Sequence, residues 1–148
     1  MANPVPLVSL TFGLPGAADV ARLREAGSVV VLNATDAREV EAAAELAPDA
    51  IVVQGREAGG HRATHGQATT PEDISTAELL DQARELSEIP LIAAGGIASR
   101  EDAAGLLGRG AVAVQVGTLF LTAREAGTKP AHRAAVSYTH LRAHETKA

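Results

Sequence analysis

Short runs of apolar and mostly β-branched residues recur along the chain and predict strands. Each run is apolar throughout rather than alternating, which is typical of strands in a parallel sheet that is covered on both faces. The predicted strands are residues 7–10, 28–32, 50–53, 91–93 and 111–116.

The segments between these strands carry apolar residues at helical spacing. Asp36 followed by Glu39, and Ser99 followed by Asp102, are typical helix starts, because the first side chain can accept a hydrogen bond from the backbone N–H three residues on. Gly27 suits the position just after a helix end. The apolar helix faces are Val20, Leu23 and Ala26, then Val40, Ala43, Ala44 and Ala47, then Leu79, Leu80, Ala83 and Leu86.

The resulting order alternates strands with helices, and a further helix can follow Thr122. Alternation of this kind predicts βαβ units with right-handed crossovers, so the fold class is α/β. Two architectures share this order: an open doubly wound sheet and part of a (β/α)₈ barrel. No G-x-G-x-x-G motif follows the first predicted strand, which disfavours a dinucleotide-binding open sheet.

Composition narrows the function classes. Hydrophobic residues make up 46% of the 148 residues, which is enough for a core, and aromatic residues only 2%. The net charge of −5 and the lack of clustered Lys and Arg disfavour nucleic acid as a partner. With no cysteine, disulfides and thiolate chemistry are excluded. The apolar runs are too short to span a membrane, and we expect a cytoplasmic protein without a metal ion.

Two consecutive predicted strands end in glycine-containing turns. Gly95 and Gly96 precede the helix that starts at Ser99, and Gly117 with Thr118 follows the last predicted strand. Glycines allow backbone N–H groups to approach an anion, and adjacent loops of this kind form the phosphate site of many barrels. The alternative is that these glycines serve only tight turns. The consecutive pair favours the phosphate site.

The longest predicted loop, residues 55–75, carries Glu57, His61, Arg62 and His65 among several glycines. Long loops in compact domains are often functional. A histidine such as His61 can accept a proton or donate to an anion near neutral pH, although a solvated loop histidine is the simpler interpretation. A metal pair formed by His61 and His65 has little support on a glycine-rich loop that offers no further ligand.

Four segments together resemble the nitronate monooxygenases, also called 2-nitropropane dioxygenases. They are IVVQGREAGGH (51–61), IAAGGI (92–97), VQVGTLF (114–120) and VSLTFGLP (8–15). The resemblance covers about residues 5–135. It implies a (β/α)₈ barrel that binds FMN without a covalent bond, with the five strands being the fourth to eighth.

The resemblance also implies site residues. His61 matches the catalytic histidine beside the flavin. The implied reaction is oxidation of an alkyl nitronate, with dioxygen, to a carbonyl compound and nitrite. The positions that match flavin contacts are Gln54, Gly59, Gly96, Gln115, Val116, Gly117 and Thr118. Thr64 and His65 depart from the family pattern just after His61, which bears on substrate preference more than on flavin binding.

Two alternatives remain open. The FMN-dependent enoyl-acyl-carrier-protein reductases share the barrel and a similar Gly-Gly-His loop. The chain can also be an inactive fragment of a flavoenzyme, since the first strands of the family pattern do not occur in it. Residues 136–148 resemble a translated sequencing adapter and show no helical periodicity, so we divide the chain into a barrel fragment, 1–135, and a non-native tail, 136–148.

Overall fold

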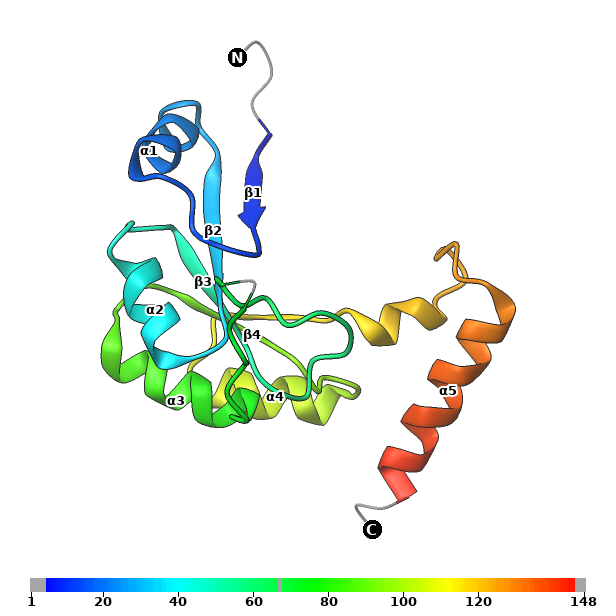
Figure 1. Cartoon of the computed structure of the whole chain (residues 1–148). Helices are drawn as coiled ribbons and strands as arrows, with labels where there is room; N and C mark the ends of the chain where they lie inside the picture. Colours follow the sequence, from blue (N-terminus) through cyan, green and yellow to red (C-terminus); the bar gives the residue numbers. More distant parts are fainter. Residues whose placement is uncertain (1–4, 67, 146–148) are drawn as a thin grey trace.

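Figure 1 shows the computed structural model of the chain, in which residues 5–66 and 68–145 are described, those from 138 onward by their backbone alone. Five parallel strands form one sheet in the order β1-β2-β3-β4-β5. The strands are β1 (Leu7–Leu10), β2 (Val29–Ala34), β3 (Ala50–Gln54), β4 (Leu91–Ala94) and β5 (Ala113–Gln115). The predicted α/β class and the five predicted strands are confirmed, with bounds that shift by up to two residues.

The helices decide between the two architectures. They are α1 (Ala17–Glu25), α2 (Ala37–Ala44), α3 (Thr76–Leu86), α4 (Arg100–Gly108) and α5 (Pro130–Glu145), with a 3₁₀ segment η1 (Thr118–Thr122). Helices α2, α3 and α4 lie on one side of the sheet (Figure 1). A doubly wound sheet reverses its strand order and carries helices on both faces. The consecutive order and one-sided helices are instead those of a curled half-barrel, consistent with part of a (β/α)₈ barrel.

The two faces of the sheet bury different residues. On the helix side, Val30, Leu32, Ile51 and Val53 are fully buried and pack with apolar residues of α2 and α3 such as Leu79. Burying each such side chain contributes about 1.5–3 kcal/mol. On the other face, a smaller cluster consists of Val31, Ala50, Val52 and Ala94. Burial on both faces explains why the runs of β2, β3 and β4 are apolar throughout, whereas β1 and β5 are only partly buried or exposed.

The predicted helix ends are formed by the expected residues. The side chain of Asp36 accepts a hydrogen bond from the Glu39 N–H, and that of Ser99 accepts one from the Asp102 N–H. Gly27 follows α1 with a φ of 87°, as a residue after a helix end commonly does. These local signals set where each helix begins, and therefore where each strand–helix loop lies.

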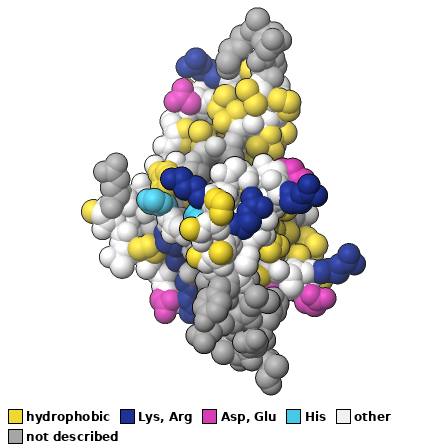
Figure 2. Space-filling view, turned by 90° about the vertical axis from the view of Figure 1, so that its right-hand side faces the viewer, with side chains coloured by type: hydrophobic (Ala, Val, Ile, Leu, Met, Phe, Trp, Pro, Cys, Tyr) yellow, Lys and Arg dark blue, Asp and Glu magenta, His cyan; other side chains and the backbone are white. Residues whose placement is uncertain are grey.

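The β1 side of the sheet leaves apolar side chains exposed. Val5, Leu7 and Val29 are 61%, 51% and 44% exposed. Figure 2 shows a group of hydrophobic side chains on the upper part of the face in view. Because the β1–β2 register places Leu7 beside Val29, these two side chains share one face of the sheet.

Helix α5 crosses the boundary that we drew after residue 135. It runs from Pro130 to Glu145, and Val136 within it is buried. The lack of periodicity in 136–145 therefore did not prevent a helix, because extending a helix costs less than starting one. Residues 146–148 of the predicted tail lie outside the described residues. Among the helices described, none combines the length and apolar character needed to cross a bilayer.

Candidate active site

The carboxyl ends of β3, β4 and β5 border a cavity of about 750 Å³, which α5 also lines. Parallel strands end at the same edge of a sheet, so the loops that follow them meet there. All seven residues predicted as flavin contacts line this cavity; they are Gln54, Gly59, Gly96, Gln115, Val116, Gly117 and Thr118. His61, the predicted catalytic residue, is exposed on the loop that follows β3 and is not part of the lining.

The turn after β4 depends on two glycines in the left-handed region. Gly95 has a φ of 110° and Gly96 a φ of 69°. A Cβ at Gly96 would lie 2.8 Å from Cβ of Glu57, and one at Gly59 would lie 2.6 Å from Oγ1 of Thr118. Side chains at these positions would therefore fill the cradle between the loops.

Backbone donors are available in this cradle. Within the described residues, the N–H groups of Gly59, Gly96 and Gly117 donate no hydrogen bond to another group of the chain. Unpaired N–H groups in glycine turns suit a phosphate. The residues present thus fit the phosphate end of a flavin mononucleotide.

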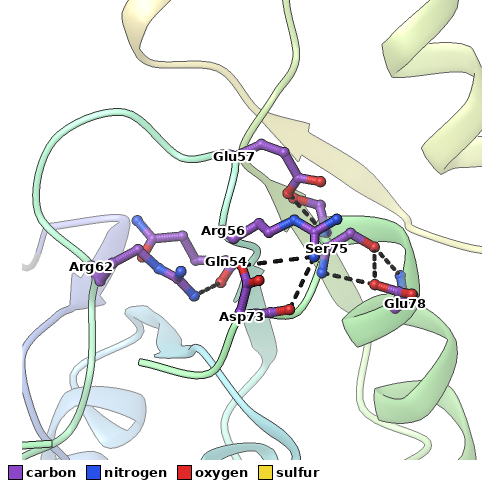
Figure 3. Close-up of polar contacts among 8 residues, drawn as sticks. Gln54, Arg56, Glu57, Arg62, Asp73, Ser75 and Glu78 are labelled. Carbon is purple, nitrogen blue, oxygen red and sulfur yellow. Dashed lines mark hydrogen bonds and ion pairs between the residues drawn. The ribbon is translucent and has the colours of Figure 1, made fainter. Parts of the chain in front are cut away.

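Glu57 ties the loop after β3 to the start of α3 (Figure 3). Its Oε2 accepts hydrogen bonds from the backbone N–H of Thr76 at 3.0 Å and from the Thr76 hydroxyl at 3.1 Å. The same hydroxyl lies 3.1 Å from the carbonyl oxygen of Ala94, at the end of β4. A carboxylate at a helix N-terminus is favoured by the helix dipole. Three elements of the cavity wall are therefore fixed relative to one another.

The long loop, residues 55–75, is closed at its base by its own ends. The Arg56 N–H donates to the carbonyl oxygen of Ile74 at 2.8 Å, and the Arg56 guanidinium donates to that of Asp73 at 3.0 Å. Ser75 and Glu78 then form a capping box that starts α3. Figure 3 shows these residues converging beside Gln54. The loop is thus a compact Ω-like excursion rather than an extended connection.

Several further contacts hold the part of the loop just after His61, among them three that involve Gln54 and Asn33. Oε1 of Gln54 accepts from the Ala63 N–H at 2.8 Å, and the Arg62 guanidinium donates to the Gln54 carbonyl oxygen at 3.0 Å. Nε2 of His65 lies 2.7 Å from the carbonyl oxygen of Asn33. Because a carbonyl only accepts, this ring nitrogen carries the proton. His65 therefore anchors the loop to the end of β2.

His61 precedes these anchors and contacts Phe12. Their rings meet edge to face, with centroids 6.2 Å apart and planes at 81°. Phe12 follows β1, is 63% exposed and has a φ of 67°, an unusual conformation for an aromatic residue. Strained residues of this kind cluster at functional sites. The contact holds one side of the His61 imidazole while leaving the rest open.

Sequence reasoning named Glu57 on the long loop but missed its contact with Thr76, and it missed His132 altogether. The contact of Glu57 with Thr76 joins positions 19 apart in sequence, so no local signal marks it. His132 lines the cavity from α5, a helix that the sequence did not predict to approach it.

Comparison with known proteins decides the family. The family model described as nitronate monooxygenase matches residues 1–147. The chain belongs to the nitronate monooxygenase family. The predicted resemblance is therefore confirmed, and with it the assignment to a family of flavin-dependent oxidoreductases.

Individual relatives agree with the family. A probable nitronate monooxygenase of Staphylococcus aureus (strain JH9) is 37% identical over 136 residues, which are 89% of this chain and 38% of that protein. The chain thus spans about two fifths of the length of that relative.

Solved structures show the same likeness. The nitroalkane oxidase from Streptomyces ansochromogenes superposes with a TM-score of 0.85 at 42% identity, covering 90% of this chain and 39% of that one. FabK (M276A) from Thermotoga maritima superposes with a TM-score of 0.77 at 29% identity, covering 88% of this chain and 40% of that one.

Proposed function

We propose that the chain forms the flavin-phosphate side of a (β/α)₈ enzyme that oxidises alkyl nitronates. Its five strands would be the fourth to eighth of that barrel. The cofactor would be FMN, and the products a carbonyl compound and nitrite. One observation carries the proposal: the glycine turns after β4 and β5 and the loop that bears His61 meet at a single edge of the sheet, around one cavity.

FMN would supply the electron-accepting group and the reaction with dioxygen when bound. The residues of this chain would bind and orient it. Gly96, Gly117 and Thr118 would hold the phosphate through backbone N–H groups and the Thr118 hydroxyl. Gln54 ends β3 and Gln115 ends β5, on either side of β4, and both would face the ring system. Gly59 would allow the loop after β3 to close on Thr118, which a side chain would prevent.

His61 would act on the substrate. An alkyl nitronate is an anion, and an imidazole can donate a hydrogen bond to its oxygens or accept a proton from the acidic carbon of the parent nitroalkane. Phe12 would hold the ring from one edge and present an apolar wall to the alkyl chain. The anchors at Ala63 and His65 would keep the loop from carrying His61 away.

The alternative, an enoyl-acyl-carrier-protein reductase, has less support. The family model and the structure with 42% identity both concern nitronates or nitroalkanes. FabK, the solved structure that bears on the reductase alternative, is only 29% identical to this chain. The formal charge of −5 also offers little attraction for an acidic carrier protein.

The proposal is tested by assaying flavin retention, nitrite release and oxygen uptake with a nitronate for the chain and for His61→Ala. General acid–base catalysis contributes about 10²–10⁴-fold, so we expect turnover to fall by that order while FMN stays bound. Thr70→Ala, on an exposed position of the same loop, is the matched control and should behave as the parent.

The outcomes separate the two parts of the proposal. Unchanged turnover in His61→Ala would remove His61 from the mechanism while leaving flavin binding intact. Failure of the parent chain to bind FMN would overturn the proposed function as a whole. Loss of FMN in His61→Ala alone would make His61 a flavin contact instead of a substrate contact.

A further inference from the structure

Helix α2 begins with a buried carboxyl group that the proposed chemistry does not use. Glu39, at the third position of this helix, is 7% exposed. Its Oε2 accepts hydrogen bonds from the backbone N–H of Thr35 at 2.8 Å and from the Thr35 hydroxyl at 2.7 Å. Its Oε1 accepts a third hydrogen bond, from the backbone N–H of His65 at 2.5 Å. One side chain therefore joins the residue that follows β2 to the long loop after β3.

Glu78, at the same position of α3, shows what starting a helix requires of a glutamate. It is exposed, and its side-chain hydrogen bonds go to the N–H and the hydroxyl of Ser75, the residue that caps α3. Glu39 makes a similar pair of contacts with Thr35 and adds one to His65, 26 residues further along the chain. Burying a carboxyl group is costly unless its oxygens are hydrogen-bonded. The burial of Glu39 and its third contact thus go beyond what a helix start needs.

His65 is held at this corner of the sheet by two different groups. Its backbone N–H donates to Glu39, and its ring nitrogen Nε2 donates to the carbonyl oxygen of Asn33 at 2.7 Å. Asn33 lies in β2, and Glu39 lies in the first turn of α2. The loop cannot shift at His65 without breaking hydrogen bonds to both elements.

The chain before His61 is much less restrained than the chain after it. Gly59 and Gly60 make no hydrogen bond within the described residues, and Gly60 has a φ of 86°. After His61, the backbone N–H groups of Ala63 and His65 both donate to side chains of other elements. Two glycines without such contacts restrain the backbone little. The position of His61 therefore depends on the anchors that follow it.

We propose that Glu39 is a positioning residue for His61, and that it acts through the backbone of the loop at His65. The inference rests on the proposed function and deepens it, since it names what holds the substrate-facing histidine in place. Gln54 holds the same loop from the flavin side, because it lines the cavity, whereas Glu39 does not line it. Loss of the Glu39 contact should therefore displace His61 and leave flavin binding intact.

Glu39→Gln breaks the loop contact selectively. A glutamine amide has one acceptor oxygen and an NH₂ group that only donates, so an oxygen kept toward Thr35 turns the NH₂ group toward the N–H of His65. Glu41→Gln, at an exposed glutamate of the same helix, is the matched control. Nitrite release with a nitronate gives kcat and KM, flavin fluorescence gives the FMN dissociation constant, and circular dichroism confirms that each variant is folded.

We expect Glu39→Gln to lower kcat about 10–100-fold, because a displacement of about 1 Å at a catalytic group costs that order. FMN affinity and KM should stay as in the parent. In a His61→Ala background the same substitution should leave kcat unchanged, since residues that act as one unit are not additive. Glu41→Gln should behave as the parent in both backgrounds.

Hydrogen exchange in the parent tests the anchor without any substitution. The backbone amide of His65 donates to Glu39, whereas that of Thr64 donates no hydrogen bond within the described residues. We therefore expect the His65 amide to exchange at least about tenfold more slowly than the Thr64 amide, as measured by NMR.

Several results would overturn the inference. Equal exchange rates at Thr64 and His65 would show that the anchor is absent. A kcat equal to that of the parent in folded Glu39→Gln, or the same loss of kcat in the His61→Ala background, would mean that Glu39 does not act through His61. If the parent neither binds FMN nor releases nitrite, the proposed function fails and the positioning role fails with it. Slow exchange at His65 would then show that the anchor exists and that the error lies in the proposed function.

Discussion

The two sets of loops around the cavity are shaped in different ways. The loop after β3 is held by side chains, through Gln54, Arg56, Glu57 and His65. The turns after β4 and β5 are short and depend on backbone conformation, with Gly95 and Gly96 at positive φ. The side-chain contacts leave His61 exposed for chemistry, whereas the glycines leave N–H groups open to a ligand. The loop after β3 thus presents a histidine side chain, and the turns after β4 and β5 present backbone donors.

The loop after β3 and the turn after β4 contact each other at Thr76, at the start of α3. A Cβ at Gly55 would lie 2.1 Å from the backbone nitrogen of Thr76, and one at Gly95 would lie 2.8 Å from the Thr76 hydroxyl oxygen. Thr76 therefore packs against both loops. We expect substitutions at this junction to have the largest effects, and substitutions at single side-chain contacts to have smaller ones.

Gly55→Ala should have the largest effect. Its methyl group would collide with the backbone at the start of α3, which cannot move without breaking the capping box, so we expect a loss of about 3–5 kcal/mol or failure to fold. Urea denaturation measures this. Gly105→Ala, inside α4 with nothing within 4 Å, is the control and should stabilise the chain by about 0.5–1 kcal/mol. A Gly55→Ala midpoint equal to that of the parent would contradict the predicted collision.

Gly96→Ala should have the second-largest effect. The left-handed φ of 69° and the contact with Glu57 together should cost about 1–3 kcal/mol and weaken FMN binding about tenfold or more. Fluorescence titration and thermal denaturation give the two values. Gly60→Ala is the matched control, because Gly60 has a φ of 86° but open space around it. Equal FMN affinity in the two variants would argue against a ligand cradle at Gly96.

His65→Ala should loosen the long loop without unfolding the sheet. It removes the hydrogen bond to Asn33, worth about 1 kcal/mol, and should speed tryptic cleavage after Arg62 several-fold. Limited proteolysis followed by mass spectrometry reads this out. His132→Ala, on α5, serves as the comparison and should leave cleavage at that site unchanged. If His65→Ala is cleaved at the same rate as the parent, the other contacts are enough to hold the loop in place.

Glu78→Gln should have the smallest effect, one that is present at neutral pH and disappears in acid. The side-chain hydrogen bond from Ser75, followed by the backbone hydrogen bond from Ser75, lowers the pKa of Glu78 below its ordinary value, while desolvation opposes this. A carboxyl whose pKa is lower in the folded state stabilises the fold above its ordinary pKa and loses that contribution as the pH falls. Urea midpoints should therefore differ between parent and variant at neutral pH and converge in acid. A constant difference across pH would contradict this.

Local signals made most of the fold predictable. Asp36, Ser99 and Gly27 mark helix ends within a few residues of sequence, and the apolar runs mark the strands. The glycine turns after β4 and β5 could be assigned to one cavity because parallel strands end together. The strand order did not follow from the alternation, because the one-sided helices that exclude the doubly wound alternative are an observation from the structure.

Contacts between distant residues could not be predicted. Sequence reasoning considered His65 only as a metal partner of His61 and as a departure from the family pattern, yet its ring lies in hydrogen-bond contact with the carbonyl oxygen of Asn33, 32 residues earlier. The approach of His132 depends on the path of the chain from η1 to α5, which no periodic pattern encodes. The division at residue 135 and the origin of residues 136–148 stay predictions, although α5 continues across that boundary.

The consecutive order of the strands also bears on how the chain is made. From β2 onward, each strand bonds to the strand that was translated just before it, so each of these strands finds a partner already made. The pairings β1–β2 and β2–β3 can form while β4 is still in the exit tunnel. Adding one strand–helix unit at a time keeps the entropic cost of closing each loop low, even though the finished sheet is entirely parallel.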